Sequence, residues 1–257
     1  MTAAGANRPD WLTARPIAHR GLHRAAEGVI ENTATAARAA IARDFAIECD
    51  VQLTADGEAM VFHDFTLDRL TQATGRLDSL SAAAVHAAAF KAGGDRIPTL
   101  AEFLAVLAGR APLVCEIKSE FNGDMRLTER TAAVVAAYAG PVALKSFDPE
   151  IVAHLRAHGA RLGVADRPLG IVTEAHYDHP EWATIPAERR REMAHLLHWD
   201  RTRPDFLSYH VKDLPNAAPY FVRMLGAPVM TWTVRTPEQV ALARDWADQM
   251  VFEGFVP

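Results

Sequence analysis

The sequence predicts an α/β protein built on one largely parallel sheet, and three observations lead to this class. Short apolar runs alternate with helical stretches along the chain, as in successive βα units. Hydrophobic residues make up 49% of the chain, which is enough to fill a substantial core. The length of 257 residues fits either two small domains or one closed barrel, which commonly needs about 250 residues. No linker-like stretch interrupts the pattern, so we expect residues 1–257 to form a single domain.

The expected strands are short apolar runs that alternate with helices, an order that indicates parallel pairing. About eight segments fit this description. They are Pro16–Arg20, Ala46–Val51, Leu113–Lys118, Val142–Ser146, Arg161–Val164, Phe206–Val211, Val229–Val234 and Gln249–Phe252.

The expected helices lie between these runs. Several of them open with Asn, Thr or Pro, residues that are common at helix N-termini. Alanine-rich segments such as Ala82–Ala89 favour helix rather than a linker. The main candidates are Asn32–Arg43, Leu100–Leu107, Thr128–Tyr138, Pro149–His158 and Pro237–Ala247.

Two segments depart from the alternation. Asp56-Gly57 is a hairpin turn signal, so it predicts a small β-hairpin insertion after the second strand, with Ala59–His63 as its returning arm. The hairpin would fold His63 back towards the second strand. The span Asp166–Asp205 contains four prolines and a charged helix near Ala187–His198. A connection this long is usually a lid, a binding loop or an interface.

Two carboxylates converge on one face of the second expected strand. Side chains alternate along a strand, so Glu48 and Asp50 point one way while Ile47, Cys49 and Val51 point the other. Close like charges need a cation between them, hydrogen bonds or a shared proton. The pair is therefore a candidate site for a hard metal ion, although a solvated polar face is an alternative.

Further charged groups follow the same pattern. Glu116 and Lys118 share one face of the expected strand at 113–118. His19 and His63 each come at the C-terminal end of a short apolar run, where α/β folds present catalytic side chains. A single histidine of this kind is often structural, but two of them beside an acidic cluster indicate a catalytic site.

The two cysteines, Cys49 and Cys115, fall on the opposite faces of their strands from the carboxylates. We expect them to pack against helices, and close to each other if the strands are neighbours. No Cys/His spacing typical of a zinc site is present in the sequence.

Composition excludes several classes of partner. The 27 Lys and Arg against 32 Asp and Glu leave a net charge of −5, which gives no basic surface for nucleic acid. No run approaches the ~20 apolar residues of a spanning helix, and residues 1–16 lack the apolar core of a signal peptide. We therefore expect a cytoplasmic protein without a stable membrane anchor. The sequence does not indicate an oligomeric state.

The order and spacing of these residues resemble the glycerophosphodiester phosphodiesterase family. The resemblance extends over about residues 17–147 and continues more weakly to Trp232-Thr233-Val234. The motifs that carry it are His19-Arg20-Gly21, Glu31-Asn32-Thr33, Glu48-x-Asp50, Thr54-x-Asp56-Gly57, His63-Asp64-x-x-Leu67-x-Arg69 with Thr71, Pro98-Thr99-Leu100 and Glu116-x-Lys118.

The resemblance implies a TIM (β/α)8 barrel that hydrolyses glycerophosphodiesters to glycerol 3-phosphate and an alcohol. It implies His19 as acid and His63 as base. The expected ligands of one divalent cation are Glu48, Asp50 and Glu116, and the expected substrate contacts are Arg20, Lys118 and Trp232. An all-carboxylate ligand set suits Mg²⁺ or Ca²⁺ better than zinc.

Two alternatives stay open at this point. One is a phospholipase D-like lyase that forms a cyclic phosphate from a lysophospholipid, since the nucleophile is either water or the substrate's own 2-hydroxyl. The other is a barrel that binds a phosphorylated metabolite without turnover. Asn32 likewise has two possible roles, as the N-cap of the helix that follows or as a support of the site.

Overall fold

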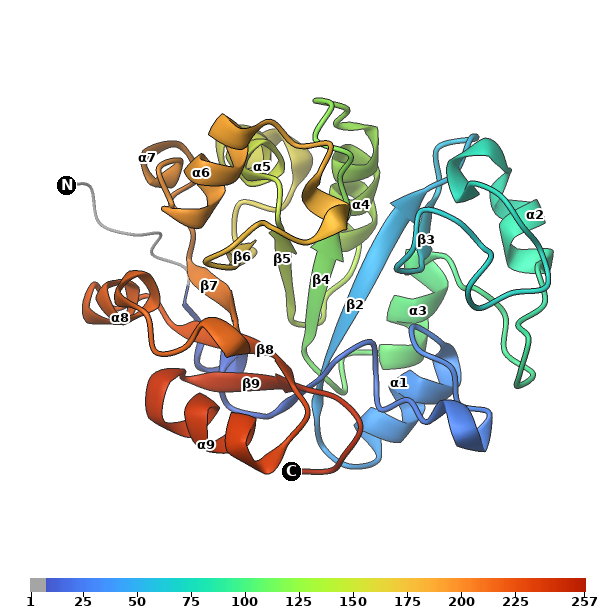
Figure 1. Cartoon of the computed structure of the whole chain (residues 1–257). Helices are drawn as coiled ribbons and strands as arrows, with labels where there is room; N and C mark the ends of the chain where they lie inside the picture. The colour runs from blue at the N-terminus through green and yellow to red at the C-terminus, as the bar shows by residue number, and fades with distance from the viewer. Residues whose placement is uncertain (1–7) are drawn as a thin grey trace.

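The chain forms a closed barrel of parallel strands with helices on its outside (Figure 1). The structure is a computed structural model that describes residues 8–257. The sheet runs in the order β1-β9-β8-β7-β6-β5-β4-β2-β3, and β1 also pairs with β2, which closes the barrel. The eight parallel strands are β1 (Ile17–Ala18), β2 (Ala46–Leu53), β4 (Leu113–Ile117), β5 (Val142–Ser146), β6 (Leu169–Thr173), β7 (Phe206–His210), β8 (Val229–Val234) and β9 (Gln249–Phe252).

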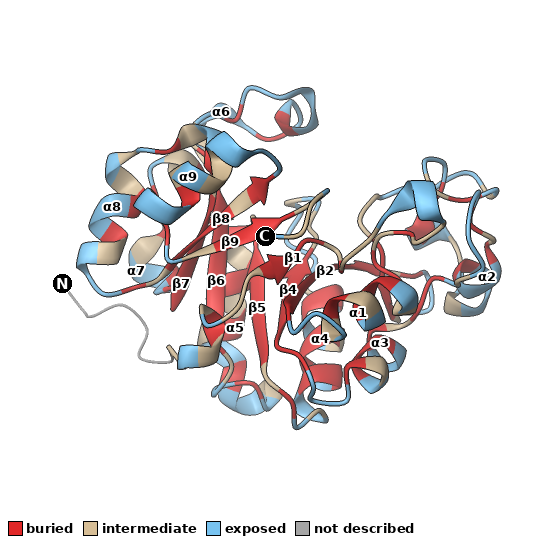
Figure 2. Ribbon diagram, turned by 90° about the horizontal axis from the view of Figure 1, so that it is seen from below, coloured by how far each residue is buried: buried red, intermediate tan, exposed pale blue. Residues whose placement is uncertain are grey.

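The predicted TIM barrel is thereby confirmed. The helices between the strands cover the outer face of the barrel, and Figure 2 shows the buried strands enclosed by helices whose outer faces are exposed. The helices are α1 (Ala34–Ile41), α2 (Ala82–Ala87), α3 (Leu100–Leu107), α4 (Arg126–Ala136), α5 (Pro149–Leu162), α6 (Ala187–Ala194), α7 (Trp199–Thr202), α8 (Ala217–Met224) and α9 (Pro237–Trp246).

The prediction of a strand at Arg161–Val164 is wrong. The helix α5 continues through this segment to Leu162 and ends at Gly163, whose φ of +74° suits glycine. The actual strand is β6, which lies five residues further on and contains Gly170. A Cβ on Gly170 would come within 2.3 Å of the Phe206 ring, so a glycine is required in the middle of this strand.

The predicted hairpin is present, and it begins a small lobe. β3 (Ala59–Val61) pairs antiparallel with β2, with Val51 opposite Val61. The chain then continues through α2 and returns to the barrel at α3, on the right in Figure 1. This lobe has an apolar cluster of its own, formed by Ile30, Met60, Phe62, Leu67, Leu77, Val85, Ala88, Phe90 and Ile97.

Two apolar layers hold the barrel together. The larger one lies between the strands and the surrounding helices and includes both cysteines, Cys49 and Cys115, as expected. They are register partners on β2 and β4, and both are free thiols. The smaller layer fills the barrel interior with residues that include Ile17, Val114 and Phe206. The interior is therefore packed, and polar side chains emerge at the C-terminal ends of the strands.

The long span before β7 is only partly the connection that the sequence suggested, because β6 lies within it. From Thr173 to Phe206 the chain forms a short 3₁₀ turn at Pro180–Trp182 and then α6 and α7. Trp182 packs in a cluster with Tyr177 and Met193, next to the strand ends. Within residues 8–257, no helix is long and apolar enough to cross a bilayer.

Candidate functional site

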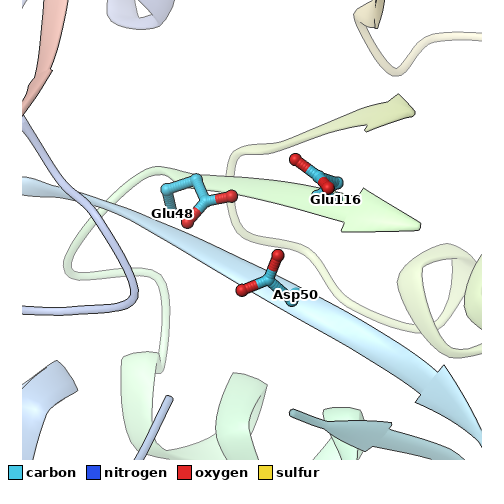
Figure 3. Close-up of side chains that lie close together, drawn as sticks. All are labelled: Glu48, Asp50 and Glu116. Atoms are coloured by element: carbon cyan, nitrogen blue, oxygen red, sulfur yellow. The ribbon is translucent and has the colours of Figure 1, made fainter. Parts of the chain in front are cut away.

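Three buried carboxylates meet inside the mouth of the barrel. Glu48 and Asp50 project from β2 and Glu116 projects from β4, where Asp50 and Glu116 are register partners (Figure 3). One oxygen of each lies within 4.8 Å of the others, and the exposed fractions of the residues are only 1%, 1% and 5%. The alternation of side chains along two neighbouring strands explains why all three converge.

The three carboxylates can hold a metal ion. The donor set is made of hard oxygens, which suits Mg²⁺ or Ca²⁺. Glu48 Oε1 is buried, and its charged neighbour among the described residues is Lys145, whose Nζ lies 3.1 Å away. A divalent cation at this oxygen would share it with that ammonium group. The residues present therefore fit the ion that the resemblance implies.

Basic side chains lower the pKa of two of these carboxylates, Asp50 and Glu116. Lys118 Nζ lies 2.8 Å from Asp50 Oδ1 and 2.5 Å from Glu116 Oε1. Burial alone raises the pKa of Asp50, but the nearby charges of Lys118, His63 and Arg20 outweigh burial and hold this pKa well below its usual range. The pKa of Glu116 is lowered in the same way, against its burial, by Lys118 and Lys145.

Asn32 supports the site and does not cap the helix. The N-cap of α1 is Thr33, whose side chain accepts a hydrogen bond from Ala36 N. The amide of Asn32 donates instead to Asp50 Oδ2 at 3.0 Å, and Asn32 Oδ1 accepts a hydrogen bond from the Asp50 backbone N–H. Asn32 thus fixes the orientation of one proposed ligand.

His19 is held by an acidic residue from the far end of the chain. It follows β1, and its Nδ1 lies 2.7 Å from Glu253 Oε2, just after β9. This contact turns Nε2 towards the carboxylates, 3.9 Å from Glu48 Oε2. Burial raises the pKa of Glu253, but the hydrogen bond and charge of His19 lower it to about 2. Sequence reasoning missed Glu253, and the signal was an acidic residue at the end of the last strand.

His63 is held by its sequence neighbour. The Nδ1 of His63 lies 2.7 Å from Asp64 Oδ1, and Arg69 binds the same carboxylate through its Nε and Nη2. Arg69 also donates to Glu31, which in turn accepts from Arg20 at 2.7 Å. The chain of contacts from Arg20 to His63 is a continuous charged network along one side of the mouth.

The opposite side of the mouth is aromatic. Phe147 follows β5, and its ring centroid lies 5.4 Å from that of Trp232 on β8 and 5.0 Å from that of Trp182. His210 at the end of β7 stacks on Trp232 with a centroid distance of 4.8 Å. Trp232 Nε1 donates to the carbonyl of Ser208 at 3.0 Å, which fixes the indole. Trp232 therefore belongs both to the interior packing and to the rim.

A cleft opens beside Lys118 on the charged side. Its volume is about 80 Å³, and it runs between β2 and the loop after β4. Lys118, Gln52 and Ser119 line it together with apolar side chains such as Phe65 and Leu127. Lys118 therefore lies between the buried carboxylates and this cleft.

Fold and site together define a TIM-barrel protein with a buried acidic group and two carboxylate-bound histidines at the C-terminal mouth. Residues 19–253 match the sequence model of the Glycerophosphoryl diester phosphodiesterase family. The chain belongs to this family of phosphodiesterase enzymes.

Individual relatives agree with this assignment. The chain is 40% identical over 111 residues to a Glycerophosphodiester phosphodiesterase of Caldanaerobacter subterraneus, a match that covers 40% of this chain and 44% of the relative. It is 39% identical over 98 residues to Glycerophosphodiester phosphodiesterase 1 of Bos taurus, covering 35% and 29%. The matched part therefore spans less than half the length of these relatives.

Solved structures show the same fold over nearly the whole chain. A phosphodiesterase of Oleispira antarctica, in complex with the product sn-glycerol-3-phosphate, superposes with a TM-score of 0.74 at 20% identity, covering 94% of each chain. A protein of Silicibacter pomeroyi that is named a putative glycerophosphoryl diester phosphodiesterase gives a TM-score of 0.70 at 22% identity and covers 97% of this chain. At these identities the likeness concerns the fold.

Proposed function

We propose that this protein hydrolyses glycerophosphodiesters to glycerol 3-phosphate and an alcohol with the help of one divalent cation. The observation that carries the proposal is the pairing of both histidines with carboxylates on either side of the acidic group. A barrel that only binds a phosphorylated metabolite needs no oriented acid and base, which favours turnover over binding alone.

The proposed ligands of the cation are Glu48, Asp50 and Glu116. When bound, Mg²⁺ or Ca²⁺ stabilises the negative charge that develops on the phosphoryl oxygens. Asn32 holds Asp50 in place by its hydrogen bond of 3.0 Å.

Arg20 and Lys118 are the proposed phosphate contacts. Lys118 lines the open cleft and supplies a mobile positive charge. Arg20 offers a planar guanidinium that matches two phosphate oxygens, and Glu31 fixes it in place. Its φ of +55° is unusual for a residue other than glycine, and such strained backbone clusters at functional sites.

The two histidines are the proposed proton donors and acceptors. Imidazole exchanges protons near neutral pH, and a carboxylate on Nδ1 leaves Nε2 to face the substrate. His63 takes the proton of the attacking water as the new P–O bond forms. His19 donates a proton to the alkoxide oxygen as the old P–O bond breaks. The products are then a phosphomonoester and a neutral alcohol, and the assignment of acid and base follows the family resemblance.

The aromatic side of the mouth is the proposed place for the organic part of the substrate. Phe147 and Trp232 present ring faces and edges opposite the charged network. The Oleispira antarctica relative, which binds sn-glycerol-3-phosphate as its product, has the same fold. A glycerophosphodiester that spans the mouth would place its phosphate against Lys118 and Arg20 and its glycerol or headgroup against these rings.

A hydrolysis screen on the purified protein tests the proposal. Glycerophosphocholine, glycerophosphoethanolamine and a lysophospholipid are each incubated with chelator and with Mg²⁺, Ca²⁺ or Mn²⁺ restored separately. We expect cleavage of a deacylated phosphodiester that chelation abolishes and one of the metals restores. Cleavage of the lysophospholipid alone, with a cyclic phosphate as product, would identify the lyase alternative. Absence of any cleavage with every metal would contradict the enzymatic proposal.

A further inference from the structure

A second lysine lies against two of the three carboxylates. Lys145 is the fourth residue of β5 and the register partner of Glu116. Its Nζ lies 3.1 Å from Glu48 Oε1 and 3.3 Å from Glu116 Oε2. Sequence reasoning passed over it because it interrupts an otherwise apolar strand without an accompanying motif.

The position of Lys145 differs from that of Lys118. The side chain of Lys118 is 14% exposed and lines the open cleft, whereas the side chain of Lys145 is only 3% exposed. On the other side of Lys145, β6 offers Gly170 as its register partner, and the Phe206 ring takes up the space that a side chain at Gly170 would need. Among residues 8–257, Lys145 therefore has its ion-pair partners on the side of the carboxylates and apolar packing on the side of β6.

Lys145 supplies the positive charge that is paired with Glu48. Among the described residues, Lys145 is the only ammonium group paired with Glu48, because Lys118 contacts Asp50 and Glu116. Three carboxylates this close repel each other strongly once they are buried. Lys145 supplies, between Glu48 and Glu116, positive charge that a divalent cation would otherwise supply.

We propose that Lys145 is a resident counter-cation of the carboxylate group, which keeps Glu48 and Glu116 together without metal and weakens the binding of the divalent ion. The inference rests on the proposed metal-dependent function, since it concerns the same three ligands. A divalent ion must enter beside a fixed positive charge and compete with it for oxygens of Glu48 and Glu116. By simple Coulomb repulsion in a partly buried site, this lowers the affinity by about 10- to 100-fold.

Metal titration of the full-length Lys145→Met protein tests the proposal. Methionine keeps most of the length of the side chain and removes the charge. Isothermal titration calorimetry with Mg²⁺ and with Ca²⁺ should show at least ~10-fold tighter binding than in the wild type. The melting temperature without metal should fall, because the carboxylates lose their partner, and metal should raise it by more than in the wild type. Equal affinities in the two proteins would overturn the proposal.

Two matched variants locate the effect. Lys91→Met removes an exposed lysine of the hairpin lobe, and we expect it to leave the metal affinity unchanged. Lys118→Met removes the ammonium group that can swing into the cleft, and we expect a smaller gain in affinity than for Lys145→Met. An equal gain in Lys118→Met and Lys145→Met would assign the effect to net charge alone and overturn the particular role of Lys145.

The wild type provides a test that does not depend on any variant folding. A resident counter-cation predicts that the wild-type melting temperature changes little when chelator is added, because the carboxylates stay paired. A wild type that loses most of its stability in chelator would overturn the proposal.

Phosphodiester cleavage on the same preparations separates this inference from the proposed function. Metal-dependent cleavage together with an unchanged affinity in Lys145→Met would refute only the role of Lys145. Tighter metal binding in Lys145→Met without any cleavage by the wild type would refute only the proposed reaction.

Discussion

The two halves of the barrel mouth differ in chemistry and in how they are built. The ends of β1, β2 and β4 and the hairpin after β2 carry a charged network in which each group contacts others within about 3 Å, such as Lys118 with Asp50 at 2.8 Å. The ends of β5, β7 and β8 carry aromatic rings such as Phe147 and Trp232, with centroids 5.4 Å apart. The charged half is held together by ion pairs and hydrogen bonds, whereas the aromatic half offers apolar area.

This difference indicates that the two halves contribute differently to catalysis and to substrate binding. Electrostatic groups held in fixed positions change the energy of a transition state, and apolar area mainly changes how tightly a substrate is held. Substitutions in the charged half should therefore lower turnover, and substitutions in the aromatic half should raise KM.

The largest effect is expected for the histidines. His19→Ala and His63→Ala should each lower kcat by roughly 10²- to 10⁴-fold, because proton transfer in the transition state is lost. Metal binding, measured by calorimetry, should be largely unchanged in both. A double variant with near wild-type turnover would show that the acid and base lie elsewhere.

Removal of a proposed metal ligand should behave differently. Glu116→Ala should lower the affinity for the metal because a direct ligand is lost. The loss should exceed the ~10- to 100-fold that follows when a residue hydrogen-bonded to a ligand is removed. Its activity should recover partly as the metal concentration is raised, whereas no metal concentration should rescue the histidine variants. If activity recovered with metal concentration in the same way in Glu116→Ala and His63→Ala, the assignment of Glu116 as metal ligand and His63 as base would be contradicted.

The contact between Glu253 and His19 should give a moderate effect. Glu253→Gln should lower kcat by roughly 10-fold, less than loss of the imidazole itself, because the ring stays in place but is held less firmly. Glu238→Gln, at an exposed position on α9, is the control and should leave kcat unchanged. A pH–rate profile should shift for Glu253→Gln alone, and an unchanged profile would reduce Glu253 to a packing role.

The same contact predicts an acid-sensitive contribution to stability. The pKa of Glu253 is lowered from 4.5 to about 2 in the folded protein, against its burial, chiefly by His19. A lowered folded-state pKa means that the stabilisation is present above about pH 4.5 and is lost as the pH falls towards 2. Thermal unfolding between these pH values should therefore show a smaller loss of stability in Glu253→Gln than in the wild type.

The smallest effects are expected on the aromatic side. Phe147→Leu and Trp232→Leu should each raise KM by roughly 2- to 10-fold, the size of a lost aromatic contact, with little change in kcat. Phe221→Leu, at an exposed position on α8, is the control and should change neither constant. A large fall in kcat with unchanged KM would place Trp232 among the groups that act on the transition state.

Much of the charged half could be predicted because its residues lie in short motifs. Alternation along one strand places Glu48 beside Asp50, and His63 lies next to the residue that holds it, Asp64. The repeated βα pattern predicted an α/β fold with a parallel sheet, and the family resemblance added the closed barrel. Local periodicity is enough where the partners of a residue are near in sequence or lie on neighbouring strands of known order.

The parts that sequence reasoning missed depend on contacts between distant segments. Glu253 lies 234 residues from His19, and only closure of the barrel between β1 and β9 brings them together. Lys145 shares no motif with Glu48, and its role appears only once β5 pairs with β4. The β6 strand was missed for a similar reason, since Gly170 is explained only by the Phe206 ring of the next strand.

The most direct measurement is the identity of the product, followed by ³¹P nuclear magnetic resonance with glycerophosphocholine and metal-loaded wild-type protein. We expect the diester signal to be replaced by that of glycerol 3-phosphate, and the His19→Ala, His63→Ala double variant to leave the diester signal almost unchanged over the same time. A wild-type protein that leaves this diester and related glycerophosphodiesters intact in the presence of Mg²⁺ and of Ca²⁺ would contradict the proposed hydrolysis.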